Sequence, residues 1–130
     1  MAEVIDTFYY MRQNKVCTKI TVCGDRVDFE YYSDFKLDKA FGNVTSATYE
    51  DLYNFFEERC FPRERANCKQ LLKMLGVDFY EPYEIVKKTH GVLGSDDYWI
   101  KFEGETLEYK EARKLVGLDV DNYEQGNNLK

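Results

Sequence analysis

The amino-acid sequence predicts an α+β fold, in which an N-terminal antiparallel β-meander of about three strands packs with three to four short helices and one further strand. Three observations predict this class. Apolar and polar residues alternate in the first 32 positions, and apolar residues recur at helical spacing from position 48 onward. The length of 130 residues suits one domain with its own core. We therefore expect a single domain at 1–120 and a frayed C-terminal tail at 121–130.

The first part of the chain has the pattern of successive strands. Residues 4–11, 16–22 and 26–32 are rich in β-branched and aromatic side chains, and the second and third of these runs alternate between apolar and polar. We expect a meander with one face on the core and the other face in solvent. Residues 33–47 have mixed polarity and predict a loop. The residues expected to share one face of the second strand are Val16, Thr18, Ile20 and Val22.

Residues 48–60 have the spacing of an amphipathic helix. Thr48 is a suitable N-cap residue, and the two acidic residues that follow in the first turn interact favourably with the helix dipole. The apolar positions recur at helical intervals, so they predict a face that packs on the core. These positions are Leu52, Phe55, Phe56 and Cys60.

The remainder of the chain predicts three helices and one strand. We expect helices at 63–75, 82–90 and 108–116 and a strand at 98–102. Gly76 follows the first of these helices and suits its C-terminal end. The side chains expected to share one face of the last helix are Ala112, Leu115 and Val116.

The N-terminal residues and the cysteines bear on compartment and metal binding. Residues 1–6 lack the basic and apolar segments of a signal peptide, and no apolar run reaches the roughly 20 residues that cross a bilayer. We therefore expect a cytoplasmic protein without membrane contact, whose thiols are reduced. The cysteine spacing does not match a zinc knuckle, so we expect no metal, no cofactor and four structural thiols. These thiols belong to Cys17, Cys23, Cys60 and Cys68.

Acidic residues are concentrated in two parts of the chain. The total of 18 Lys and Arg against 24 Asp and Glu gives a net charge of −6, which disfavours a protein that coats DNA. Acidic clusters of this kind are often only solvent-exposed faces of a protein. The alternative, functional interpretation is that they form a docking surface for a partner with a basic surface. The candidates for this acidic surface are Asp96, Asp97, Glu103, Glu105 and Glu108, with Glu57 and Glu58 as a second patch.

A basic group lies between the two acidic groups. Residues 63–73 contain four basic side chains and only one acid, and three of the four lie four residues apart, so they would line one side of a helix. Direct contact with nucleic acid is therefore an alternative hypothesis. We favour the acidic surface because the chain as a whole is negative. The basic candidates are Arg63, Arg65, Lys69 and Lys73.

No set of residues has the spacing of a catalytic site. Asp96 and Asp97 are adjacent, and neighbours in sequence point in different directions unless a turn gathers them. The only histidine, His90, directly precedes a glycine, so a position at a helix C-terminus explains it better than catalysis. We expect no catalytic residues, with a nucleic-acid-processing enzyme as the remaining alternative.

Within residues 72–115 the chain resembles small proteins carried by mobile elements of Firmicutes, and the matching motifs are Leu72–Gly76, Tyr80–Pro82, Thr89–Gly91 and Asp97–Glu105. The stretch from Asp97 to Lys101 is also similar to a segment ahead of the kinase domain in HipA-like proteins. This chain lacks that kinase domain, so the resemblance carries over no kinase activity. The resemblance covers about a third of the chain and implies a bacterial or phage accessory protein. Genes of this kind often encode inhibitors of host defence, including anti-CRISPR proteins.

Charge and resemblance together lead to one functional expectation. We expect a small, acidic, non-enzymatic protein that inhibits a host defence nuclease by occupying its basic nucleic-acid groove. The expected partner is a CRISPR effector nuclease or its guide complex, and the acidic candidates would make the contact. The alternative is an accessory factor that binds nucleic acid through the basic residues of 63–73.

Overall fold

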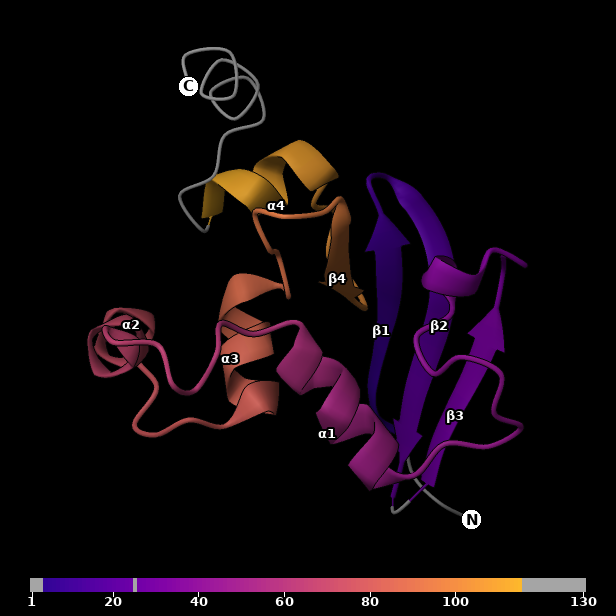
Figure 1. The fold of residues 1–130 in the computed structure, drawn as a ribbon. Coiled ribbons are helices and arrows are strands. Elements are labelled where there is room, and N and C mark those ends of the chain that lie inside the picture. The colour runs from indigo at the N-terminus through magenta and orange to yellow at the C-terminus, as the bar shows by residue number, and fades with distance from the viewer. Residues whose placement is uncertain (1–3, 25, 116–130) are drawn as a thin grey trace.

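The computed structural model describes residues 4–24 and 26–115, and within them it confirms the predicted α+β class (Figure 1). A three-strand meander is followed by a short 3-10 turn, three helices, a fourth strand and a last helix. The elements are β1 (Val4–Arg12), β2 (Lys15–Cys23), β3 (Arg26–Tyr31), η1 (Lys36–Asp38), α1 (Tyr49–Glu58), α2 (Cys68–Leu75), α3 (Pro82–Thr89), β4 (Tyr98–Phe102) and α4 (Tyr109–Leu115).

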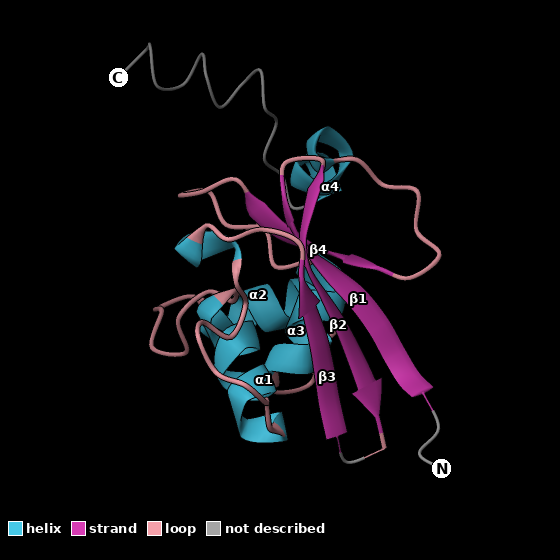
Figure 2. Ribbon diagram, turned by 90° about the vertical axis from the view of Figure 1, so that its right-hand side faces the viewer, coloured by secondary structure: helices cyan, strands magenta, loops and turns pink. Residues whose placement is uncertain are grey.

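The four strands form one antiparallel sheet in the order β3-β2-β1-β4. The last strand therefore returns to lie beside the first, and β3 and β4 are the two edges. Figure 2 shows α1, α2 and α3 on one side of the sheet and α4 near one end of it. None of the helices described in 4–24 and 26–115 has the length and apolarity needed to cross a membrane.

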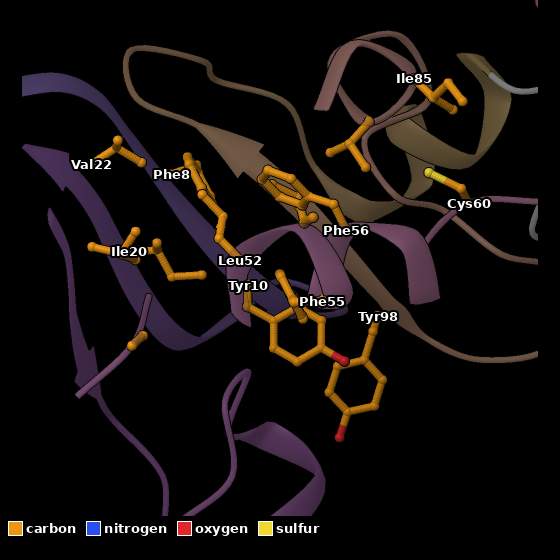
Figure 3. Packing of buried hydrophobic residues seen from close by; sticks show 14 of the residues in the cluster. Phe8, Tyr10, Ile20, Val22, Leu52, Phe55, Phe56, Cys60, Ile85 and Tyr98 are labelled. Carbon is orange, nitrogen blue, oxygen red and sulfur yellow. The ribbon is translucent and has the colours of Figure 1, made fainter. Parts of the chain in front are cut away.

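The main core lies between the sheet and α1 with α3. Phe8 and Tyr10 of β1 and Ile20 of β2 meet the buried face of α1, and the rings of Phe8 and Phe56 lie 5.3 Å apart between centroids (Figure 3). The helix begins where the sequence predicts, because the Thr48 hydroxyl and the Asp51 carboxylate form a reciprocal capping box. The four side chains predicted to face the core are buried; Leu52, Phe55 and Phe56 lie on α1, whereas Cys60 lies two residues beyond the helix, which ends at Glu58 and not at the predicted residue 60.

A second, smaller core lies on the opposite face of the sheet. Successive side chains of a strand point to opposite faces, so Met11 and Trp99 leave the main core and pack against Ala112 of α4. The expectation that this face of the meander meets only solvent is therefore wrong at the end that α4 covers. Trp99 is fully buried there, and its indole N–H donates to the Gln13 carbonyl at 2.5 Å.

One strand residue lies on the face opposite to the predicted one. Tyr10 pairs with Thr18, whereas the next residue, Met11, pairs with Val16, so Cys17 is an extra residue in the ladder. A bulge of this kind moves the side chains beyond it to the other face. Val16 consequently packs against the second core, while Thr18, which pairs with Tyr10 of the main core, is fully buried. Strict alternation in the sequence does not reveal a bulge, because it assumes an unbroken ladder.

The helix predicted at 63–75 begins only at Cys68. Arg63 and Arg65 precede it in turns, where the Arg65 N–H donates to the Pro62 carbonyl at 3.1 Å. Five of the eight residues of α2 are apolar, whereas residues 63–67 contribute only one alanine that could pack. Most of the stability of short helices comes from packing an apolar face, so the helix forms where such a face exists. It ends at Gly76 in the left-handed conformation, as predicted.

The last two helices follow the sequence with one correction. Helix α3 starts at Pro82 and ends at His90, which takes the left-handed conformation with φ of 56° and confirms the C-terminal position expected for this histidine. Ala112 of α4 is buried, whereas Leu115, which we expected to share its face, is 60% exposed. Val116, the domain boundary at 120 and the predicted tail at 121–130 lie outside the described residues.

Candidate functional site

Two of the predicted acidic residues, Asp96 and Glu105, accept backbone N–H groups at the free edge of β4. Three N–H groups of this strand point away from β1, and each of them has an acceptor outside the sheet. An edge whose donors are satisfied does not pair with another strand. The three pairs are Tyr98 N with Asp96 Oδ1 at 3.0 Å, Ile100 N with His90 O at 2.7 Å, and Phe102 N with Glu105 Oε1 at 2.7 Å.

Asp96 also accepts a bidentate pair of hydrogen bonds from Arg59, which directly follows α1. The guanidinium nitrogens lie 2.8 and 3.0 Å from the carboxylate, and the same side chain donates to the carbonyls of Gly91 at 3.0 Å and Tyr98 at 2.6 Å. Burial opposes ionisation of Asp96, but the hydrogen bonds and charge of Arg59 hold its pKa below the ordinary value. Asp96 therefore joins the end of α1 to the start of β4.

Glu105 has a similar internal role at the other end of β4. One of its carboxylate oxygens lies 2.8 Å from His90 Nε2, and the other accepts the Phe102 N–H. His90 is buried, and its carbonyl accepts the Ile100 N–H. Two of the predicted acidic candidates, Asp96 and Glu105, thus hold the edge strand in place.

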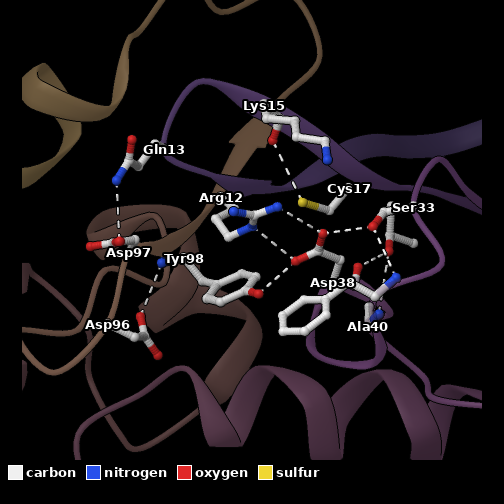
Figure 4. A network of polar contacts seen from close by, with 12 residues as sticks. Arg12, Gln13, Lys15, Cys17, Ser33, Asp38, Ala40, Asp96, Asp97 and Tyr98 are labelled. Carbon is white, nitrogen blue, oxygen red and sulfur yellow. Dashed lines mark hydrogen bonds and ion pairs between the residues drawn. The ribbon is translucent and has the colours of Figure 1, made fainter.

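A buried carboxylate that the sequence did not single out lies nearby. Asp38 of η1 is fully buried and accepts from Arg12 Nε at 3.1 Å, Ser33 Oγ at 2.7 Å and the Tyr98 hydroxyl at 2.6 Å (Figure 4). Burial raises the pKa of Asp38, but these donors outweigh it and lower the pKa to about 2. Its backbone carbonyl accepts from Thr18 at 2.7 Å. No sequence pattern indicates this network, because its members lie on four separate segments.

The other three candidates of this stretch are spread along the surface. Asp97 accepts from Gln13 at 3.2 Å and from the Tyr109 hydroxyl at 3.1 Å, and Glu103 accepts from the Tyr9 hydroxyl at 2.8 Å. Asp97 and Glu103 flank the two ends of β4, and the six extended steps between them separate their backbones by roughly 20 Å. Glu108 is exposed just before α4. These carboxylates therefore do not converge on one point.

The outer face of α1 carries a different group of acids. Glu50, Glu57 and Glu58 are exposed there, together with Tyr53, and the helix contains no basic residue. Glu57 lies 3.5 Å from Arg63, and both side chains are about half exposed, so this ion pair is weak. Among the described residues Glu50 and Glu58 have no side-chain hydrogen bond or ion pair.

The four basic candidates divide between a turn and a helix. The guanidinium of Arg63 lies 4.3 Å from the centroid of the Tyr80 ring, which fixes it over that ring. Arg65 is exposed in the turn, and Lys69 and Lys73 are exposed on α2. These three have no ion-pair partner in the part of the chain that the structure describes.

No group of three or more His, Cys, Asp and Glu side chains within the described residues is placed to hold a metal ion. All four cysteines are free thiols, and burial raises the pKa of Cys60 to about 12, so this thiol is not a nucleophile at neutral pH. No family model, curated protein or solved structure matches the chain.

Proposed function

We propose that the chain is a non-enzymatic interaction protein that binds a basic partner surface through the outer face of α1. The observation that carries this proposal is the contrast between carboxylates. Those of Asp96 and Glu105 are engaged inside the molecule, whereas those of Glu50 and Glu58 are exposed on a helix without basic residues. The outer face of α1 is thus the most available negative surface among the predicted candidates and their neighbours.

Exposed carboxylates on a rigid helix suit a partner that binds nucleic acid. Such a partner has a groove lined by Lys and Arg, and carboxylates compete with phosphates for these side chains. The negative field also accelerates the encounter with a basic groove, and added salt weakens that effect. Together with the resemblance at 97–105, this supports a role as an anti-CRISPR-like inhibitor that occludes the nucleic-acid groove of a CRISPR effector nuclease.

The test is a DNA-cleavage assay with a panel of purified guide-loaded CRISPR effector nucleases. We expect the wild-type protein to slow cleavage by one of them, and the inhibition to weaken as salt is raised. The double variant Glu50→Lys/Glu58→Lys should lose the inhibition. A control, Asp34→Lys/Asp78→Lys, changes the net charge equally at exposed acids outside α1 and should retain it.

Two outcomes of this assay would contradict the proposal. One is a wild-type protein that inhibits no nuclease of the panel at any salt concentration. The other is an equal loss of inhibition in both double variants, which would show that only net charge matters and that α1 is not the contact surface.

A second candidate function is direct nucleic-acid binding by the basic residues. It is favoured by the exposure of Arg65, Lys69 and Lys73 and by the absence of ion-pair partners for them within the described residues. The test is a gel shift with single- and double-stranded DNA and RNA at low salt, where electrostatic binding is strongest. A shift that Lys69→Glu/Lys73→Glu abolishes would support this candidate, and no shift would exclude it.

A further inference from the structure

A large apolar groove lies where the described part of the chain ends. It has a volume of about 610 Å³ and lies between the residues that follow α1, helix α2, the segment 89–94 and the end of α4. Leu115, the last described residue, forms part of its wall. The residues that follow Leu115 in the sequence are therefore tethered to the groove itself. The other apolar side chains of the wall include Phe61, Leu71, Met74, Leu75 and Leu93.

The two sides of the groove expose apolar side chains that the core does not use. Met74 of α2 is 81% exposed, and Leu115 of α4 is 60% exposed. Of the five apolar residues of α2, only Leu72 is buried. Apolar surface that is grouped in this way is unfavourable in water and marks a place where something else packs. The groove therefore favours an apolar occupant.

The sequence directly after Leu115 is suited to such a groove. Residues 116–120 read Val-Gly-Leu-Asp-Val, so the three apolar residues alternate with a glycine and an aspartate. In an extended segment alternate side chains point the same way, so Val116, Leu118 and Val120 would face one surface. Five extended residues reach roughly 17 Å, which exceeds the roughly 10 Å diameter of a helix such as α2. Residues 116–120 therefore have the length and the apolar side chains needed to fill the groove.

The covalent connection favours this segment over a separate molecule. A segment that begins in the wall of the groove has an effective concentration in the millimolar range there, whereas a separate partner must lose translational freedom on binding. The wall offers little charge to select another occupant. Of its two charged residues, Arg59 is held by Asp96, and only Arg65 is exposed. Apolar contact and connectivity therefore decide the occupant.

We propose that residues 116–120 of the chain dock in this groove, with their apolar side chains covering Met74. The docked segment closes an apolar surface that would otherwise favour self-association. Because α4 packs on the second core and Leu72 of α2 belongs to the main core, the segment also joins the two. Neither Glu50 nor Glu58 lines the groove, so this docking is independent of the proposed function.

The experiment measures how fast hydrogen peroxide oxidises each methionine of the full chain, with the sites located by mass spectrometry. Methionine becomes its sulfoxide only where the reagent reaches the sulfur. We expect Met74 of the folded wild type to react roughly tenfold more slowly than the same methionine in a synthetic peptide of residues 70–78, because the docked segment must open first. The variant Leu118→Asp/Val120→Asp should bring the rate close to that of the peptide.

Two controls separate docking from charge and from unfolding. The variant Asn127→Asp/Asn128→Asp adds the same two charges further along the chain and should leave Met74 protected. Met11 is 3% exposed in the second core, so its oxidation reports on opening of the fold. Its rate should stay at the wild-type value in both variants. If Met11 also reacts faster in the Leu118→Asp/Val120→Asp variant, the milder Leu118→Ala/Val120→Ala decides by the same criterion.

Three outcomes would overturn the proposal. One is a Met74 that reacts in the wild type as fast as in the peptide. Another is protection that the substitutions at 118 and 120 leave unchanged, or that those at 127 and 128 reduce equally. The third is protection that is lost on dilution, which would assign the groove to a second copy of the chain. The Glu50→Lys/Glu58→Lys variant should keep Met74 protected, so failure of the proposed function and failure of this docking are distinguishable.

Discussion

The carboxylates at the free edge of β4 and those on the outer face of α1 are alike in sign in the sequence, but they have different roles in the fold. Asp96 and Glu105 accept backbone N–H groups of the edge strand and pair with Arg59 and His90. Glu50 and Glu58 project from a helix in which the Thr48 side chain already accepts the Asp51 N–H. The two groups differ because the backbone N–H groups beside Asp96 and Glu105 need hydrogen-bond acceptors.

An edge strand has N–H groups that require acceptors, and a helix surface does not. Asp96 and Glu105 are therefore explained by the need to protect that edge, whereas Asp97, Glu103 and Glu108 are exposed around it. On α1, Asp51 belongs to the capping box and Glu50 lies in the first turn, where the helix dipole favours an acid, but neither Glu50 nor Glu58 accepts a backbone N–H. Four measurements test this contrast, beginning with the largest expected effect.

Replacing Arg59 by methionine should lower the free energy of unfolding by about 3 kcal/mol, because it leaves Asp96 and two carbonyls without their donor. Urea denaturation measures this change. The control is Arg26→Met, which removes the exposed pair with Asp28 and should cost less than about 1 kcal/mol. Equal losses in the two variants would contradict the structural role of Arg59.

The pH dependence of stability should reveal the buried carboxylate behind the edge. The pKa of Asp38 falls from an ordinary 3.8 to about 2 on folding. A lowered carboxyl pKa stabilises the fold above pH 4, and this contribution of about 2 kcal/mol is lost as the pH falls from about 4 to about 2. Urea denaturation across this range should show a steeper loss for the wild type than for Asp38→Asn. Parallel pH profiles would show that Asp38 is not responsible.

Neighbouring glutamates provide a matched comparison within the same turn. Glu105→Ala should cost about 1–2 kcal/mol, because the Phe102 N–H and His90 lose their acceptor. Glu103→Ala should cost about 0.5 kcal/mol or less, since Glu103 binds only an exposed tyrosine hydroxyl. Thermal unfolding of the two variants side by side measures the difference. A larger loss for Glu103 would reverse the assignment of internal and external acids.

The smallest effect on stability is expected on α1. Glu58→Lys should change the free energy of unfolding by less than about 0.5 kcal/mol, with a slight gain because a positive charge at a helix C-terminus interacts favourably with the dipole. Chemical denaturation is again the measurement. A loss above 1 kcal/mol would mean that Glu58 has a structural partner and is not simply available to a binding surface.

Particular elements show which features of the fold can be predicted from the sequence alone. The period-two runs, the Thr48 cap and the Gly76 end predict the strands and the boundaries of two helices, because they depend on residues close together in the chain. The bulge at Cys17 and the late start of α2 at Cys68 escape prediction. Both depend on which apolar side chains find a surface to pack against, and that surface is made by distant segments.

The candidate surfaces likewise have some features that the sequence identifies and others that it does not. The sequence identifies the acidic and basic side chains and their grouping, and it places Glu57 and Glu58 on a helix. It does not distinguish Asp96, which is held by Arg59, from Glu58, which is exposed, and it gives no sign of Asp38. Hydrogen bonds and ion pairs between residues that lie dozens of positions apart in the sequence make these distinctions.

The sequence by itself determined the α+β class, the order of the elements and a net charge of −6, since all three follow from local pattern and composition. Only the tertiary structure decided which charges are available. The return of β4 to the side of β1 creates an edge with three outward N–H groups, and burial makes an unpaired donor costly. Asp96 and Glu105 satisfy two of those donors and the His90 carbonyl satisfies the third, whereas Glu50 and Glu58 of α1 have no side-chain partner among the described residues.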